Sequence, residues 1–234
     1  MYHVLFVDDE PMLLAIAKLT LEESGEFSLT TITSATEALV VMHEVPFDAI
    51  VSDYHMPGMD GTQFLKEIRA TYGDLPFILF TGRGREEVVI EAVNNGADFY
   101  LQKGGDPRSQ FVELMHKVRQ SVDKRKAERD LRESEKRLTD LINFLPDATF
   151  AIDREGKIIA WNRAIENLTG VTAAGMLGKG DHEYAIPFYG ERRPLLIDLI
   201  FEPDEKIKNS YFNIRRENAV LMAESELPRP QGNG

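Results

Sequence analysis

The sequence predicts an α/β fold, in which a five-stranded parallel sheet carries helices on both faces, followed by a smaller α+β domain. In the first half of the chain, short apolar runs alternate with amphipathic helical patterns, which is typical of a parallel sheet built from strand–helix units. Runs such as Val4–Val7 and Phe77–Phe80 are apolar throughout, as strands buried on both faces should be. A hairpin pattern after Pro146 begins the second domain.

The first half contains alternating candidates for strands and helices. The expected strands are His3–Val7, Phe27–Ile32, Ala49–Val51, Phe77–Phe80 and Phe99–Leu101. The expected helices are Met12–Glu23, Thr36–His43, Gln63–Tyr72, Glu86–Asn94 and a long helix from about Gln110. Pro11 suits the start of the first helix, because a proline there loses no hydrogen bond.

The last of these helices is predicted to continue far beyond the sheet, since residues 111–145 contain no Gly or Pro. Its middle is rich in charges of both signs. One side carries a short heptad seam with a polar break, formed by Leu131, Ser134, Leu138, Leu141 and Leu145. Two interpretations stay open: a solvated connector helix, or a parallel coiled coil that joins two protomers, which we favour.

The second domain is expected to begin with a hairpin. Its expected strands are Ala148–Ile152 and Lys157–Trp161, joined by the turn Asp153–Gly156. Short helices are expected at Arg163–Leu168, Ala173–Leu177 and Pro194–Ile200, and a further strand pair at Tyr211–Arg215 and Val220–Glu224. The end of the chain, from about residue 228, is rich in Pro and Gly and is expected to be disordered.

Composition excludes several kinds of function. The chain of 234 residues has no cysteine, so disulfides, thiolate catalysis and iron–sulfur clusters are excluded, and a reducing cytoplasm fits. The net charge of -12 argues against nucleic-acid binding over most of the surface. No apolar run is long enough to span a bilayer, and the acidic N-terminal sequence does not resemble a signal peptide.

Polar residues gather where the predicted strands end. Asp8, Asp9 and Glu10 follow the first expected strand, and Asp53 follows the third. Thr81 follows the fourth, and Lys103 follows the fifth. A single Asp after a strand is more often a turn or cap residue. The carboxyl ends of parallel strands, however, meet at the same edge of a sheet, where α/β proteins bind their ligands. We therefore expect these side chains to form one site.

The residue types in this site suit phosphoryl transfer. Clustered carboxylates repel one another unless a cation is present, and Mg²⁺ prefers such oxygen ligands. A carboxylate such as Asp53 can also act as a nucleophile towards phosphorus and form an aspartyl-phosphate. Lys103 would then neutralise a phosphoryl oxygen, and the Thr81 hydroxyl would donate a hydrogen bond to one.

Residues 1–123 resemble the receiver domain of two-component response regulators. The segments VDDEP, SDYHMPGMDG, FTGRG and GADFYLQK occur in the order of that family's four signature segments. The resemblance implies a flavodoxin-like sheet of strand order 2-1-3-4-5. It also implies that the domain accepts a phosphoryl group from a sensor histidine kinase and is not an enzyme beyond its own phosphorylation and dephosphorylation.

The resemblance assigns a role to each residue of the site. Asp53 becomes the phosphoacceptor, and Lys103 contacts the phosphoryl group. Asp9, Asp53 and the backbone carbonyl of His55 become Mg²⁺ ligands, and Asp8 assists through water. Thr81 and Tyr100 become the pair that switches conformation.

One segment departs from the family pattern. The family usually has a proline after the lysine, often with a cis bond, whereas Gly104-Gly105 follows Lys103 here. A cis bond that does not precede proline costs about 2.5–4 kcal/mol. We therefore expect a trans Lys103–Gly104 bond and a more mobile loop.

From about Leu138 the chain resembles a PAS sensor domain, through the segment LINFLPDATFAIDREGKIIAWNRAIENLTG with Asn162 at a recurrent position. The match fades after Ala223, so one or two C-terminal strands are expected to be missing, which leaves the first strand as an open edge. His182 is the only histidine in this half and is expected to be a loop residue, and we expect no cofactor here. The expected parts are a receiver at 1–123, a linker helix at 124–138 and a PAS-like domain at 139–234.

The combined interpretation is a cytoplasmic response regulator. It relays the phosphorylation state of Asp53, by conformational change, to the PAS-like domain or to a partner. A homodimer through the linker helix, or through the face of the fourth and fifth helices, is a further expectation. The alternatives are a fragment of a hybrid sensor histidine kinase and a binding scaffold whose acidic site is not phosphorylated. A haloacid-dehalogenase-like phosphatase is disfavoured, because that family carries its nucleophile after the first strand.

Overall fold

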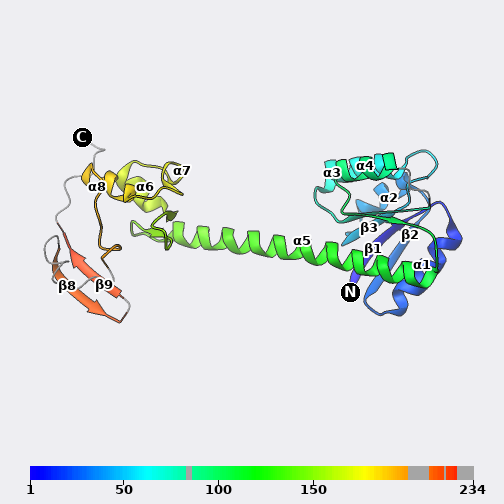
Figure 1. Ribbon diagram of the computed structural model, residues 1–234, viewed down its shortest axis with the longest axis horizontal. Coiled ribbons are helices and arrows are strands. Elements are labelled where there is room, and N and C mark those ends of the chain that lie inside the picture. Colours follow the sequence, from blue (N-terminus) through cyan, green and yellow to red (C-terminus); the bar gives the residue numbers. More distant parts are fainter. Residues whose placement is uncertain (83–85, 200–210, 219, 226–234) are drawn as a thin grey trace. The chain divides into compact units, whose positions relative to one another are not determined.

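The computed structural model describes residues 1–82, 86–199, 211–218 and 220–225 (Figure 1). The chain divides into two compact units, residues 1–131 and 132–234. The expected disordered tail from residue 228 lies outside the described residues.

The first unit contains a five-stranded parallel sheet in the order β2-β1-β3-β4-β5, which confirms the predicted flavodoxin-like topology. Its strands are β1 (Tyr2–Val7), β2 (Phe27–Ile32), β3 (Ala49–Ser52), β4 (Phe77–Thr81) and β5 (Phe99–Gln102). The connecting helices are α1 (Pro11–Glu23), α2 (Ala35–Met42), α3 (Gly61–Tyr72), α4 (Glu86–Asn94) and α5 (Pro107–Phe144).

Helices cover both faces of this sheet: α1 and α5 lie on one face, and α2, α3 and α4 lie on the other (Figure 1). Alternate residues of each strand serve the two layers. In β1, for example, Leu5 packs towards α2 and α3, while Phe6 packs towards α1 and α5, and both are fully buried. This two-sided burial explains why the central strands are apolar without alternation.

Helix α3 begins at a capping box immediately after the loop that follows β3. The Asp60 side chain accepts hydrogen bonds from the backbone N–H groups of Thr62 and Gln63, at 2.9 and 2.8 Å. The Gln63 side chain accepts one from the backbone N–H of Asp60 at 3.1 Å. Such reciprocal bonds satisfy backbone donors that have no partner within the helix, so the start of α3 is fixed.

Helix α5 is fastened to the sheet over its first half. Its buried face contributes Phe111, Leu114 and Val118 to the core. Further along, the Tyr2 hydroxyl donates to Asp123 at 2.9 Å. The leucines of the predicted seam are exposed in the single chain, so the coiled coil stays a prediction.

The second unit begins with the predicted hairpin, β6 (Phe150–Ile152) and β7 (Ile158–Trp161), which are antiparallel. The later elements are α6 (Arg163–Thr169), α7 (Ala173–Met176), the 3₁₀ helix η1 (Glu183–Ala185), α8 (Ile186–Tyr189), and the antiparallel pair β8 (Phe212–Glu217) and β9 (Val220–Glu224). The pairing of the last two strands was predicted, whereas η1 and α8 were not.

The helix predicted at Pro194–Ile200 is wrong over its described residues, because 194–195 have no regular structure and 196–199 form turns. The Asp198 carboxylate explains the difference. It accepts a hydrogen bond from the backbone N–H of Leu195 at 2.7 Å and another from the Tyr184 hydroxyl. These two bonds, one local and one to a buried tyrosine, hold the segment as a turn, which a local apolar pattern cannot reveal.

Asn162 connects the parts of the second unit, and its side chain is fully buried. Its Oδ1 accepts hydrogen bonds from the backbone N–H groups of Ile165 and Thr149, at 3.0 and 2.9 Å. Its Nδ2 donates to the backbone carbonyl of Asp147 at 2.9 Å, and to that of Ile142, near the end of α5, at 3.2 Å. One amide thus caps α6 and ties the hairpin to the end of the long helix.

The hairpin β6–β7 forms a two-stranded sheet, and within the described part of the chain no strand pairs with the other edge of β6. Two strands alone are marginally stable in water. The arrangement agrees with the expected open edge of the first strand, although the missing strands themselves stay a prediction.

We predict that the backbone amides of β6 exchange with solvent roughly a hundredfold or more faster than those of Val4–Val7 in β1, because local opening of a two-stranded sheet costs much less than opening a central strand. Hydrogen exchange followed by mass spectrometry on the monomeric chain measures both segments at once. Equal protection of β6 and β1 would show that the second unit closes this edge by itself.

Candidate functional site

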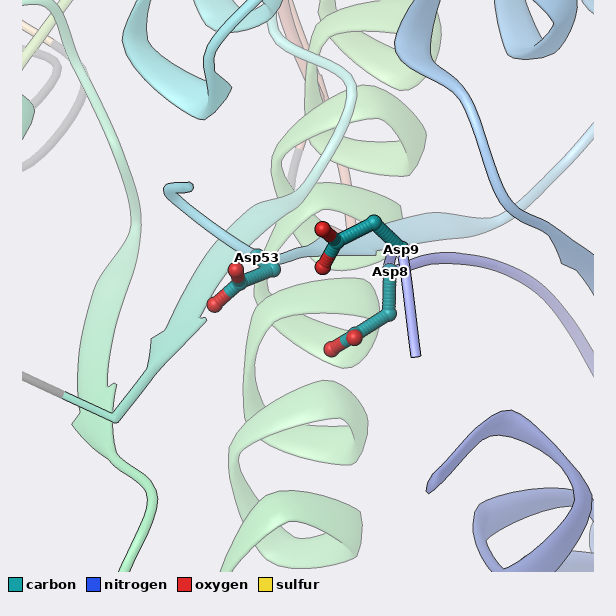
Figure 2. A group of neighbouring side chains, drawn as sticks. All are labelled: Asp8, Asp9 and Asp53. Carbon is teal, nitrogen blue, oxygen red and sulfur yellow. The ribbon is translucent and has the colours of Figure 1, made fainter. Parts of the chain in front are cut away.

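The polar residues predicted to form a site lie together at the carboxyl edge of the parallel sheet. Asp8 and Asp9 follow β1, and Asp53 follows β3, its neighbour in the sheet. Figure 2 shows the three carboxylate groups gathered at the ends of these two strands. Thr81 is the last residue of β4, and Lys103 follows β5. All five residues therefore reach the same edge.

Asp53 is nearly buried, with a side chain that is 7% exposed. Its Oδ2 accepts a hydrogen bond from the backbone N–H of His55 at 3.0 Å. Its Oδ1 lies 3.0 Å from Lys103 Nζ, an ion-pair distance, yet this oxygen accepts no hydrogen bond of normal geometry from any described residue. Asp53 Oδ1 is thus held by the charge of Lys103 and not by a well-aligned hydrogen bond.

Lys103 also pairs with Asp8, whose side chain is fully buried, through an Nζ–Oδ2 distance of 2.6 Å. Burial raises the pKa of Asp8, and the hydrogen bond from Lys103 only partly offsets this. Burial alone would lower the pKa of Lys103, but its hydrogen bond to Asp8 and the charge of Asp53 raise that pKa above its ordinary value. Lys103 therefore remains an ammonium ion between two carboxylates.

The three aspartates form a set that suits a hard divalent cation. One carboxylate oxygen from each of Asp8, Asp9 and Asp53 can be chosen so that all lie within 4.8 Å of one another. Among the described residues, the ammonium of Lys103 is the cation that pairs with this group, so one positive charge faces three carboxylate side chains. Because Asp53 Oδ1 also accepts no well-aligned hydrogen bond from the described residues, the all-oxygen donor set fits Mg²⁺.

Two hydroxyl groups of the first unit, on Thr81 and Tyr100, are buried. Neither Thr81 Oγ1 nor the Tyr100 hydroxyl forms a hydrogen bond within the described ranges of the chain. Burial raises the pKa of Tyr100, so its hydroxyl stays protonated as a potential donor. The predicted switch pair thus consists of two donors that have no fixed acceptor here.

The loop after Lys103 has a trans peptide bond, as predicted, since no cis bond occurs among the described residues. The φ angles of Gly104 and Gly105 are +148° and +90°. Other residues rarely adopt such angles, so both positions depend on glycine. The predicted higher mobility of this loop stays a prediction.

Gly61, the first residue of α3, has a role in the site that the sequence patterns did not predict. A Cβ atom at this position would lie 2.3 Å from the backbone oxygen of Asp53 and 2.8 Å from Leu79 Cδ1. The backbone N–H of Gly61 donates to the carbonyl of Tyr54 at 2.9 Å. Gly61 therefore lets the start of α3 press against the backbone of the phosphoacceptor candidate. The sequence feature that could have indicated this role is a glycine directly after Asp60, the N-cap residue of α3.

His55 contributes through its backbone, because its side chain is exposed and lies edge-on to Tyr54. Its N–H orients Asp53 Oδ2. The predicted role of its carbonyl as a metal ligand stays a prediction.

Comparisons with known proteins agree with this geometry. Residues 4–118 match the family model of the response regulator receiver domain, and residues 136–187 match that of the PAS fold. Two-component response regulator ORR21 of Oryza sativa subsp. indica is 41% identical over 102 residues, which cover 43% of this chain and 14% of that protein. Response regulator Rre1 of Synechocystis sp. is 37% identical over 107 residues, which cover 44% of this chain and 46% of that protein.

The chain thus spans less than half the length of these curated relatives. Among solved structures, a CheY-like response regulator receiver domain protein from Methanospirillum hungatei JF-1 superposes with a TM-score of 0.50 and 26% identity. The match covers 55% of this chain and 98% of that one. Across the described residues, no helix has the length and apolar character needed to cross a bilayer.

We predict that Gly61→Ala lowers the free energy of unfolding of the first unit by about 1–3 kcal/mol, because the added methyl group meets backbone that cannot move without displacing Asp53. Urea unfolding followed by circular dichroism measures the change. Gly82→Ala is the matched control, because a Cβ there has nothing within 4 Å. Equal midpoints for the two variants would contradict the close contact.

Proposed function

From the premise that residues 4–118 are a response regulator receiver domain and residues 136–187 are a PAS fold, we propose that the chain accepts a phosphoryl group on Asp53. The donor would be the phosphohistidine of a partner sensor kinase. The observation that supports this most strongly is the buried Asp53 carboxylate, whose Oδ1 accepts no well-aligned hydrogen bond from the described residues and has an ammonium 3.0 Å away. A nucleophile and a counter-charge for a phosphoryl group are thus in place together.

The proposed reaction transfers one phosphoryl group between two side chains. A lone pair of an Asp53 carboxylate oxygen forms the new O–P bond. The P–N bond to the partner's imidazole breaks, and its electron pair stays on the imidazole nitrogen. The product is an aspartyl-phosphate, and its return to the free carboxylate needs only water as the acceptor. Such transfer relies mainly on positioning and charge neutralisation.

The proposed Mg²⁺ ligands are Asp9, Asp53 and the backbone carbonyl of His55, with Asp8 assisting through water. Bound Mg²⁺ would supply positive charge for the phosphoryl oxygens. The chain's own contribution is to hold the carboxylates close together, within 4.8 Å for one oxygen of each aspartate. The N–H of His55 keeps one Asp53 oxygen in place at the same time.

Two further residues are proposed to contact the phosphoryl group. Lys103 already lies between Asp8 and Asp53, so its ammonium would move from these carboxylates towards a phosphoryl oxygen. The Thr81 hydroxyl, which is buried without a described partner, would donate a hydrogen bond to another phosphoryl oxygen. This new acceptor would hold Thr81 in one position.

The signal is proposed to spread from Thr81 to Tyr100 on the neighbouring strand. Movement of Thr81 towards the phosphoryl group changes the space beside Tyr100 and biases a two-state surface near α4 and α5. Because α5 continues from the receiver domain to residue 144, this bias can reach the PAS fold or a second copy of the chain. We keep residues 1–123, 124–138 and 139–234 as the proposed receiver, linker and PAS-like parts.

We predict that incubation with acetyl phosphate and Mg²⁺ adds about 80 Da to the wild-type chain, the mass of one phosphoryl group, and adds nothing to Asp53→Asn. Intact-mass spectrometry reads both results directly. Asp140→Asn, which changes an exposed aspartate on α5, serves as the control and should be modified like the wild type. An unmodified wild type would favour a scaffold whose site is not phosphorylated.

We also predict that Asp9→Asn weakens Mg²⁺ binding about tenfold or more, because a neutral amide replaces one charged ligand. Isothermal titration calorimetry with Mg²⁺ measures the affinity without any phosphoryl donor. Glu10→Gln removes the same charge from the next residue and should bind nearly as tightly as the wild type. If both variants lose affinity equally, the effect is one of net charge and Asp9 is not a ligand.

A further inference from the structure

The segment that carries Lys103 has little intrinsic stiffness. It joins the end of β5 at Gln102 to the start of α5 at Pro107. Gly104 and Gly105 both have positive φ angles, and glycine loses more conformational freedom on folding than any other residue. Lys103 nevertheless has to hold its ammonium within ion-pair distance of two carboxylates. Some other part of the chain has to fix this backbone.

Gln110, in the first turn of α5 after its cap, spans the segment with its side-chain amide. Its Nε2 donates to the backbone carbonyl of Gly104 at 2.5 Å and lies 3.3 Å from that of Gln102, also as a donor. The two acceptors are the residues directly before and after Lys103. Both are carbonyl oxygens, so the amide must present its NH₂ group and its orientation is determined.

The start of α5, which carries Gln110, is itself fixed in place. Asp106 caps α5 by accepting hydrogen bonds from the backbone N–H and the hydroxyl of Ser109, at 2.9 and 2.8 Å. Phe111, the residue directly after Gln110, is buried in the core. On the opposite side of the loop, the backbone N–H of Lys103 donates to the carbonyl of Thr81 at 2.7 Å. Lys103 is thus held by β4 at its own N–H and by Gln110 at both neighbouring carbonyls.

We infer that Gln110 is a positioning residue for Lys103: it holds the glycine-containing loop so that the ammonium stays between Asp8 and Asp53. It acts through the backbone and does not touch the reacting atoms. This inference rests on the proposed phosphorylation of Asp53. A glutamine suits the task because its NH₂ offers two donors without adding a charge beside the acidic site.

The test compares Gln110→Met with Gln120→Met in the full chain. Methionine has similar length, no charge, no donor and a helix propensity close to that of glutamine. Gln120 lies on the same helix with an exposed side chain, so it controls for the substitution itself. Phosphorylation rates are measured by intact mass over a range of phosphoramidate concentrations at saturating Mg²⁺.

We expect Gln110→Met to lower the maximal rate about three- to tenfold, the effect of losing one or two uncharged hydrogen bonds, while Gln120→Met matches the wild type. In a Lys103→Ala background, Gln110→Met should have no further effect, because the residue that it positions is gone. A wild-type rate for Gln110→Met would overturn the inference. An equal loss in both backgrounds would also overturn it, since the role would then be purely structural.

Hydrogen exchange gives a second measurement that does not depend on the rate of phosphorylation. Amides of residues 103–106 should exchange faster in Gln110→Met than in Gln120→Met, and unchanged exchange would refute the inference. Failure of the proposed function looks different: the wild-type chain itself would then gain no phosphoryl group, whatever the loop does.

Discussion

The ion pair that Lys103 forms with Asp8 and Asp53 is the interaction on which the site depends. Two carboxylates this deeply buried repel one another and lose most of their hydration, so their charged forms need a cation nearby. Lys103 supplies it at 2.6 and 3.0 Å. Because the pair joins the ends of β1, β3 and β5, it also fixes the sheet edge at which the chemistry would occur.

Two backbone features let this charged cluster exist in a packed fold. At Gly61 the absence of a side chain allows α3 to approach the carbonyl of Asp53. At Gly104 and Gly105 the chain turns away from Lys103 through angles that favour glycine. Gly61 leaves room for a close backbone contact, whereas Gly104 and Gly105 allow backbone angles that other residues rarely adopt. Only the second feature needs a compensating support, which the Gln110 amide provides.

The second unit is held differently from the first. The receiver domain buries strands on both faces, whereas the second unit contains two separate strand pairs among its described residues and relies on polar ties. Asn162 and Asp198 each make several hydrogen bonds that fasten a short helix or turn to its surroundings. Such ties specify geometry, but they bury less apolar surface than a five-stranded sheet does.

The sequence by itself determined the parallel α/β class and the residues at its acidic edge through local patterns, whereas the receiver strand order was implied by the resemblance of its signature segments to that family. Apolar runs mark buried strands, and charged residues that follow them closely, such as Asp53 and Lys103, must reach one edge of a parallel sheet. It could not determine contacts between residues far apart in the chain. Only the tertiary structure decided that Lys103 lies closer to Asp8 than to Asp53, that Gly61 touches the Asp53 backbone, and that Asp198 turns a predicted helix into a loop. These depend on contacts of about 3 Å or less between residues of the folded chain, which local periodicity does not encode.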